Sequence, residues 1–196
     1  METLKLNEED IYNKYKKITA SEISSIKQWT TGEKIYYKGE EFSIIQEKTF
    51  KAKISINIKE TQKELIITVP ENISQEDLKI NIDKGIKQLF KKNTEILIAS
   101  KLPYWSKMTG FEYNQVKIRD ATTRYGSCMP TKKNLYFSSR LIMLPEKVVD
   151  AIIVHELCHM KYKNHNKDFY DLVATYIPNY KEIDKWLKVN GKMIMF

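Results

Sequence analysis

All three histidines of this 196-residue chain lie between positions 155 and 165. Two of them frame the run His155-Glu156-Leu157-Cys158-His159, which has the pattern H-E-x-x-H. On a helix, residues four apart lie on one face, so both imidazoles can reach the same metal ion. His165 follows six residues later and can add a third ligand if the chain turns back. The chain must therefore form a helix and a turn here, and we predict that they bind one metal ion.

The ligand types indicate zinc. Catalytic zinc sites are commonly four-coordinate, with three protein ligands and a fourth position left to water. We therefore expect His155, His159 and His165 to bind one Zn²⁺ ion. Glu156 stands beside the first ligand, where it can act as the general base on metal-activated water. A helix that carries histidines by chance is the competing interpretation, and the lack of any other histidine in the chain weakens it.

Cys128 gives a hypothesis of a different class. If its thiolate were a fourth ligand, the zinc site would be closed and structural, and the protein would be a non-catalytic, zinc-stabilised binding module. Glu156 argues against this alternative, because a structural site needs no base beside its ligands. Cys158 lies between two ligands in sequence but on another face of the helix, so we expect it to be a small buried hydrophobic residue.

Length and composition suit one globular domain, with 42% hydrophobic residues. The first ten residues lack the basic start and apolar stretch of a signal peptide, and no run of about eighteen apolar residues predicts a membrane span. These features predict a cytoplasmic protein without membrane contact, whose two cysteines are free thiols. The net charge of +8 would permit nucleic acid as a partner, but the lysines are spread among glutamates, so this support is weak.

The residue pattern divides the chain into an extension and one domain of α+β class. Residues 1–30 are polar with a helical spacing of apolar residues, which predicts a helical N-terminal extension. Residues 31–75 alternate in polarity and predict a small antiparallel β-sheet packed against helices. Residues 76–196 complete the domain and contain the metal site. Residues 35–40 are expected to form a strand and a turn, and further strands are expected at residues 42–46, 53–58, 65–69, 115–119 and 135–139.

A long helix is expected over residues 77–99. Ser74 is its predicted N-cap, with Asp77 in the capping-box position three residues later. A linker that contains Pro103 and Gly110 should follow, because proline and glycine commonly interrupt helices.

The metal-binding helix is expected to cover residues 145 to about 163. It would end where Asn164 adopts the left-handed conformation, and this turn would bring His165 back toward the metal. Asn166 or Asp168 can then cap the next helix.

These motifs together resemble the YgjP-like metallopeptidase family, which is related to the SprT-like and WLM zincins. That family has an Arg-aromatic-Gly-Ser-Cys block, a strand, a helix with H-E-L-x-H, and an Asn-His pair followed by Phe. The resemblance covers roughly residues 33–190 and implies a zincin-like helical core with one zinc site. The matching residues here are 124–128, 155–159, Asn164, His165 and Phe169, with Pro178 and Tyr180 in a Pro-x-Tyr at the end of the last helix.

Two positions depart from the family pattern. Tyr125 stands where the family usually has tryptophan, and Ser138 stands where asparagine is common. Both lie outside the expected ligand set, so the departures concern substrate contacts rather than metal binding.

The resemblance implies a zinc metallopeptidase that acts on peptides or proteins. Zincins commonly bind an extended peptide along an edge strand, and residues 135–139 are the expected edge. Members of the family have also been linked to pyrophosphohydrolysis of nucleoside triphosphates, especially UTP, which is the alternative activity. A SprT-like role in cleaving DNA-bound protein is a third option. Nothing in the sequence indicates an oligomeric state.

Arg124 is the remaining candidate for the site. Its planar guanidinium can bind a carboxylate or a phosphate through two parallel hydrogen bonds, so it can act catalytically by orienting substrate or stabilising negative charge. It can equally form a structural salt bridge that holds a turn at Gly126. Both interpretations are open at the level of the sequence. Gly126 and Ser127 themselves are expected to be turn residues.

Overall fold

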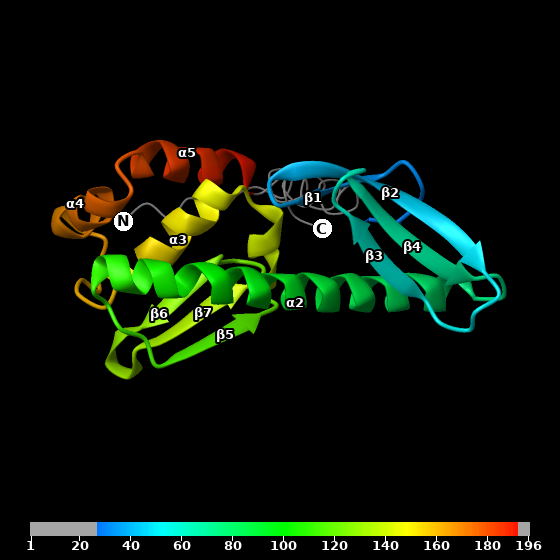
Figure 1. The fold of residues 1–196 in the computed structure, drawn as a ribbon, viewed down its shortest axis with the longest axis horizontal. Coiled ribbons are helices and arrows are strands. Elements are labelled where there is room, and N and C mark those ends of the chain that lie inside the picture. The colour runs from blue at the N-terminus through cyan, green and yellow to red at the C-terminus, as the bar shows by residue number, and fades with distance from the viewer. Residues whose placement is uncertain (1–26, 192–196) are drawn as a thin grey trace, which may run out of the picture. The chain divides into compact units, whose positions relative to one another are not determined.

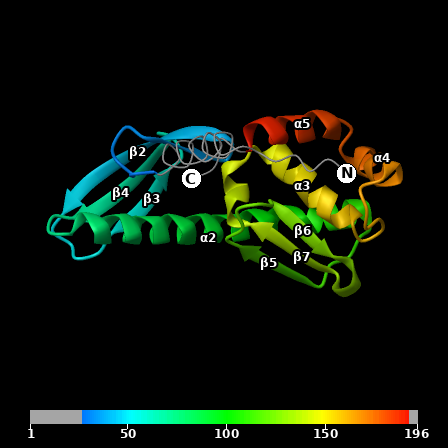
Figure 2. The same ribbon diagram turned by 180° about the vertical axis from the view of Figure 1, so that it is seen from behind.

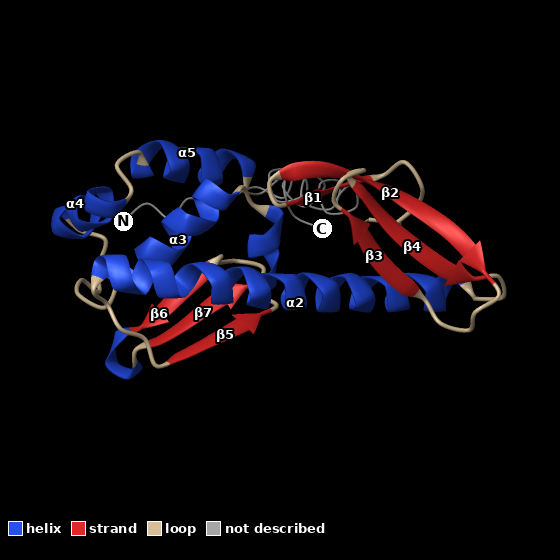
Figure 3. Ribbon diagram, viewed as in Figure 1, coloured by secondary structure: helices blue, strands red, loops and turns tan. Residues whose placement is uncertain are grey.

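The computed structural model describes residues 27–191 (Figures 1 and 3). The helical extension predicted for residues 1–30 therefore lies outside the described residues, except for residues 27–30, which are in no helix or strand. The described part confirms the α+β class, with two β-sheets, one long helix and three shorter ones. None of the helices in this part of the chain is long and apolar enough to cross a membrane.

The first sheet has the strand order β1-β2-β4-β3. Its strands lie where they were predicted, but β2 and β4 run parallel, with Ile44 opposite Leu65, so the prediction of a wholly antiparallel sheet is wrong. Leu65, Ile66 and Ile67 are all buried, which requires β4 to be central and covered on both faces. The strands are β1 (Lys34–Tyr37), β2 (Glu40–Thr49), β3 (Ser55–Lys59) and β4 (Glu64–Pro70).

Helix α2 (Gln75–Thr109) packs against both sheets (Figure 1). It begins as predicted, because Oγ of Ser74 accepts a hydrogen bond from the backbone N–H of Asp77 over 3.1 Å. The apolar residues that face the sheets recur every four positions along it, as expected for one face of a helix. These buried residues are Ile82, Ile86, Phe90, Ile98 and Leu102, with Thr94 in the same row.

The linker predicted around Pro103 is wrong, because α2 continues through this proline to Thr109. Proline removes one helical hydrogen bond, but the buried row continues beyond the predicted end through Leu102 to Thr109, and tertiary packing of such a face stabilises a helix more than propensity does. The helix ends at Gly110, which takes the left-handed conformation with φ 73° and donates its N–H to the carbonyl of Ser106.

The second sheet has the order β5-β7-β6 (Figure 2). Strand β7 (Asn134–Ser138) is parallel to β5 (Gln115–Arg119) and antiparallel to β6 (Gly126–Met129). The strands at 115–119 and 135–139 were predicted, whereas β6 was not. Since β7 is central, the prediction that residues 135–139 form a peptide-binding edge is wrong. Leu135 and Phe137 explain the position, because both are fully buried. The edge beside the histidines is β6.

Helix α3 (Glu146–Cys158) ends earlier than the sequence predicted. His159 is its C-cap residue with right-handed backbone angles, and the backbone N–H groups of Met160 and Lys161 bond back to the end of the helix. Asn164 is not among the described residues with positive φ, so the predicted left-handed break there is wrong. A short series of turns brings the chain around instead.

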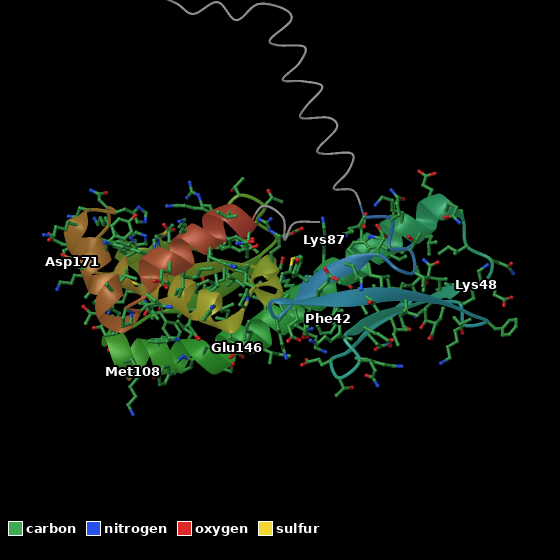
Figure 4. All side chains as sticks on the ribbon, turned by 90° about the horizontal axis from the view of Figure 1, so that it is seen from above. Phe42, Lys48, Lys87, Met108, Glu146 and Asp171 are labelled. Atoms are coloured by element: carbon green, nitrogen blue, oxygen red, sulfur yellow. The ribbon has the colours of Figure 1, made fainter. Side chains whose placement is uncertain are left out.

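Two further helices complete the domain. Asn166 caps α4 (Lys167–Tyr176) as predicted, and its side-chain oxygen accepts a hydrogen bond from the N–H of Phe169 over 3.0 Å. The helix α5 (Tyr180–Asn190) was not predicted. Tyr176 of α4 donates a hydrogen bond to the carbonyl of Thr109, and Figure 4 shows Asp171 of α4 and Met108 of α2 at the same end of the domain.

Candidate metal centre

The three histidines converge on one point. Their candidate ligand atoms all lie within 4.8 Å of one another, and Nε2 of His155 is 3.0 Å from Nε2 of His165. His155 lies in the last turns of α3, His159 caps that helix, and His165 precedes α4. The structure thus brings together the three residues that the spacing singled out, in an arrangement that could hold a metal ion.

The second nitrogen of two imidazoles is engaged by the protein. Nδ1 of His159 lies 2.9 Å from the carbonyl oxygen of Tyr162, and Nδ1 of His155 lies 2.7 Å from the hydroxyl of Tyr180. A carbonyl oxygen can only accept, so Nδ1 of His159 carries the proton and leaves the lone pair of Nε2 free for a metal. The donor set therefore fits a divalent cation such as Zn²⁺.

Phe169 fixes the positions of the imidazole rings. Its side chain is fully buried and stacks on His159 with ring centroids 4.6 Å apart. It also meets His155 and His165 edge-on, at 4.8 and 4.9 Å. Phe169 was expected in the core, and its buried ring contacts the imidazoles of all three histidines.

Burial favours the neutral form of His155 and His159. Desolvation, followed by the neighbouring histidines, lowers the pKa of His155 to about 3. Desolvation also lowers the pKa of His159, against the opposing effect of its bond to the Tyr162 carbonyl. A neutral imidazole is the form that binds a metal.

Glu156 is the most unusual carboxyl group of the described chain. It is only 5% exposed, and its Oε2 has no hydrogen-bond partner among residues 27–191. Burial raises its pKa to about 8, although the positive charge of Arg124 acts in the opposite direction. Such a pKa allows the group to accept and release a proton near neutral pH.

Gly126 makes room for this carboxyl group. A β-carbon built on Gly126 would lie 2.5 Å from Oε1 of Glu156, which is closer than side chains tolerate. The interpretation of Gly126 as a turn residue is wrong, because it is the first residue of strand β6 and its φ is not positive. No local pattern predicts this contact, since the two residues are thirty positions apart.

Arg124 lines a cleft of about 550 Å³ together with the metal-site residues and Lys163. Its side chain is exposed, and it forms no ion pair with any carboxylate within residues 27–191, so the structural salt bridge considered for it is not found there. Arg124 is therefore free to face a ligand in the cleft.

The structural arginine near this strand is Arg140, which the sequence analysis missed. It is 6% exposed, its Nε donates a hydrogen bond to the carbonyl of Ala121 over 3.1 Å, and its guanidinium lies 5.4 Å from the ring centroid of Tyr125. No pattern marks it, because an isolated arginine in an apolar segment looks the same whether its head group is buried or exposed.

Neither cysteine belongs to the histidine cluster. The thiol of Cys128 donates a weak hydrogen bond to the sulfur of Met160 over 3.8 Å, and burial raises its pKa to about 12, with a further contribution from Glu156. Cys158 is fully buried, as predicted. Among the described residues, the three histidines alone form the candidate ligand group.

Comparisons with known proteins agree with these features. The model of the YgjP-like metallopeptidase domain family matches residues 1–190. A UTP pyrophosphatase of Escherichia coli (strain K12) is 32% identical over 72 residues, which are 36% of this chain and 43% of that relative, so the match spans less than half of that protein.

A solved structure is also similar in part. The crystal structure of the metallopeptidase zymogen of Pyrococcus abyssi abylysin is 20% identical, with a TM-score of 0.44, and the match covers 50% of this chain and 96% of that one. The family match extends over nearly the whole chain and includes the histidine cluster. The chain therefore belongs to the family of YgjP-like metallopeptidase domains.

Proposed function

We propose that this protein is a zinc-dependent metallohydrolase and that its activity is that of a peptidase. The observation that carries the proposal is the convergence of three imidazoles beside a buried carboxyl group whose Oε2 has no partner within residues 27–191. Membership of a metallopeptidase family supports the same reaction class.

His155, His159 and His165 would hold the ion. When bound there, zinc would supply Lewis-acid chemistry, lowering the pKa of a water molecule and polarising the substrate carbonyl group, whose carbon is attacked. The hydrogen bonds of His155 to Tyr180 and of His159 to the Tyr162 carbonyl orient the rings for this task.

Glu156 is the proposed general base. Its carboxylate takes a proton from the attacking water and returns it to the leaving amine when the peptide bond breaks. Its Oε2 has no partner within residues 27–191, so this oxygen is available to accept the proton. Gly126 provides the space in which this carboxyl group lies against strand β6.

Arg124 is the proposed substrate-facing cation. It lines the cleft beside Glu156, it is exposed, and its fork of donors suits a carboxylate of the substrate or the negative charge that develops during attack. Strand β6 is an edge strand of its sheet within residues 27–191 and borders the same cleft, so an extended peptide could pair with its backbone there.

Pyrophosphohydrolysis of a nucleoside triphosphate is the second candidate. Two observations favour it: the similarity to a UTP pyrophosphatase over 72 residues, and the presence of Arg124 and Lys163 in one cleft with the histidines. Two cations in a cleft can bind phosphate groups as readily as they bind carboxylates.

A side-by-side assay separates the two activities. The purified, zinc-loaded protein and its Glu156→Gln variant would be given an unfolded protein and UTP in parallel. We expect cleavage of the protein by the wild type and loss of cleavage by about 100-fold or more in the variant, which should keep its zinc. Pyrophosphate release from UTP that depends on Glu156 would replace the peptidase assignment with the second candidate. Retention of full activity by the variant would refute Glu156 as base.

A further inference from the structure

A groove of about 600 Å³ lies between helix α2 and strand β5, at the edge of the second sheet that is opposite to β6. Figure 2 shows β5 as the outer strand of this sheet, beside α2. Four consecutive residues of β5, 116–119, line the groove, so the strand borders it along its edge and not with one face only. Within residues 27–191 no strand pairs with this edge, which leaves the outward backbone groups of β5 open to a further strand.

The floor of the groove is aliphatic. Ile118 of β5 and Ile98 and Leu102 of α2 are buried there. Val116 is half-buried and Ala99 is exposed, so the apolar surface continues to the rim. A strand that paired with β5 would place every second side chain against this surface, where burial stabilises an apolar group.

The other face of β5 is cationic. Side chains alternate along the strand, so Lys117 and Arg119 point away from the apolar face that carries Ile118. Both cationic side chains are exposed, and the guanidinium of Arg119 lies 3.8 Å from the ring centroid of Tyr136 on the neighbouring β7. No ion pair within residues 27–191 neutralises either cation.

The acids near this edge do not cancel its positive charge. Asp120, directly after β5, is paired with Lys87 at 3.3 Å. Among the described residues that line the groove, Glu95 is the one acid, against three cations that include Lys91 of the same helix. The groove therefore has an excess of positive charge, which attracts an acidic ligand.

We propose that this groove binds an extended segment of a partner protein in which apolar and acidic residues alternate, and that the segment adds a strand to the edge of β5. Its apolar side chains would lie against Ile98 and Leu102, and its acidic side chains would lie beside Lys117 and Arg119. In this mode of recognition, backbone pairing supplies affinity and the side chains supply specificity. The inference is independent of the reaction proposed for the metal centre, because β5 and the β6 edge at the histidine cleft lie on opposite sides of β7.

Two other occupants fit the groove less well. A second copy of this chain that paired through β5 would bring together two faces that each carry Lys117 and Arg119, and like charges on paired strands repel. A single-stranded nucleic acid would match the charge but has no alternating backbone donors and acceptors for β5. Tyr113 is also the one aromatic residue among the described residues that line the groove, so stacking of successive bases has little support.

Fluorescence anisotropy of the full chain with labelled peptides of about ten residues tests the proposal. One peptide alternates valine with glutamate, and the other alternates valine with lysine. The glutamate peptide should bind at least about ten-fold more tightly, and added salt should shrink its advantage. Lys117→Glu should remove this preference, since it reverses the charge beside the acidic side chains. Equal affinity of the wild type for the two peptides would overturn the proposed charge recognition.

N-methylation of the glutamate peptide tests the backbone pairing. Side chains and N–H groups alternate together along a strand, so the amides of the valines point to one edge and those of the glutamates point to the other. Two further peptides carry N-methyl groups on the valines or on the glutamates. One of them should bind at least about ten-fold more weakly and the other should bind as before. Equal binding of the two methylated peptides would overturn the addition of a strand.

Ala99→Glu and Ser100→Glu are a matched pair of variants. Both residues are exposed and adjacent on α2, but only Ala99 lines the groove. Ala99→Glu should weaken binding of the glutamate peptide at least about ten-fold, and Ser100→Glu should leave it nearly unchanged. Equal effects of the two variants would show that the peptide responds to net charge alone and would overturn the groove assignment.

Absence of peptide binding would overturn the proposal as well. Binding of a single-stranded oligothymidylate that Ala99→Glu weakens would then assign the groove to nucleic acid. A dimer of the wild type that Ala99→Glu dissociates in sedimentation would assign it to a second copy of the chain.

Discussion

A β-carbon on Gly126 would lie 2.5 Å from Oε1 of Glu156, so strand β6 and helix α3 approach each other as closely as a glycine permits. The contact links the two elements that border the cleft. It places the candidate base without any hydrogen bond to Oε2, the only buried side-chain N or O atom without a partner within residues 27–191.

Gly126→Ala should therefore displace the carboxyl group of Glu156 and leave the histidines in place. Misplacement of a catalytic group by about 1 Å can cost about 100-fold in rate, so we expect a loss of this order in kcat/KM with one zinc still bound per chain. Steady-state kinetics and metal analysis measure both quantities.

Gly85→Ala is the control for this variant. The new β-carbon would lie 2.6 Å from Cδ1 of Ile56, the end of a flexible side chain outside the metal site. It should leave kcat/KM unchanged. If Gly126→Ala were as active as Gly85→Ala, the close contact with Glu156 would have no catalytic role.

The stability of the metal-free protein should fall as the pH rises from 6.5 to 8. Glu156 has a pKa of about 8 when folded and an ordinary value of 4.5 when exposed, so the unfolded state loses its proton first and unfolding becomes easier across this interval. His155 and His159 act in the opposite sense, because folding lowers the pKa of both imidazoles from 6.5. Only about 0.4 kcal/mol from each is still to be gained above pH 6.5, which is less than the loss from Glu156.

Urea unfolding of the wild type and Glu156→Gln at several pH values measures this effect. The free energy of unfolding of the variant, minus that of the wild type, should rise by about 1 kcal/mol per pH unit between pH 6.5 and 8. If the free energies of unfolding of the two proteins changed equally with pH, the pKa of Glu156 would not be raised by folding.

Tyr180→Phe should weaken metal binding. The variant removes the hydroxyl that engages Nδ1 of His155 at 2.7 Å but keeps the aromatic ring. Loss of such a partner commonly lowers metal affinity about 10-fold to 100-fold. Competition with a chromogenic chelator gives the zinc affinity.

Tyr176→Phe is the matched control, because the Tyr176 hydroxyl bonds to the carbonyl of Thr109 at 3.4 Å. This variant should bind zinc like the wild type. Equal zinc affinity of the two variants would rule out a role for the Tyr180 hydroxyl.

The two arginines near strand β6 should respond differently to replacement by alanine. Arg124→Ala should leave the free energy of unfolding within about 0.5 kcal/mol of the wild type and lower kcat/KM, because this side chain is exposed in the cleft. Arg140→Ala should cost about 1–3 kcal/mol of stability, because it removes a buried side chain that bonds to the Ala121 carbonyl. Urea unfolding and kinetics on both variants test the pair. A large decrease in the free energy of unfolding of Arg124→Ala would indicate a structural role for Arg124 instead of contact with the substrate.

Local patterns in the sequence predicted the parts of this structure that depend on near neighbours. The spacing of His155 and His159 identified the helical pair, and Ser74 and Asn166 marked the starts of α2 and α4. Each of these signals involves residues within a few positions of one another. Their physical cause lies in the helix itself, so it can be read without knowledge of the fold.

The features that escaped prediction depend on contacts between distant segments. The space for Glu156 of α3 is provided by Gly126 of strand β6, and the hydrogen-bond partner of His155 is Tyr180 of the unpredicted helix α5. The central position of β7 and the continuation of α2 past Pro103 are likewise set by what packs on them. The low helix propensity of proline favours ending α2 near Pro103. The buried face of α2 nevertheless continues through Leu102, so packing against the rest of the domain extends the helix.

Helix α3 supplies His155 and caps with His159, whereas His165 and Phe169 come from the turn and the first residues of α4. A single cation shared by these imidazoles would add a second connection between α3 and α4, which already pack through Phe169, so ion binding and local folding would share one free energy. Without the ion, residues 160–166 would be more accessible to proteases, and the lifetime of the protein in a cell would then depend on the supply of zinc.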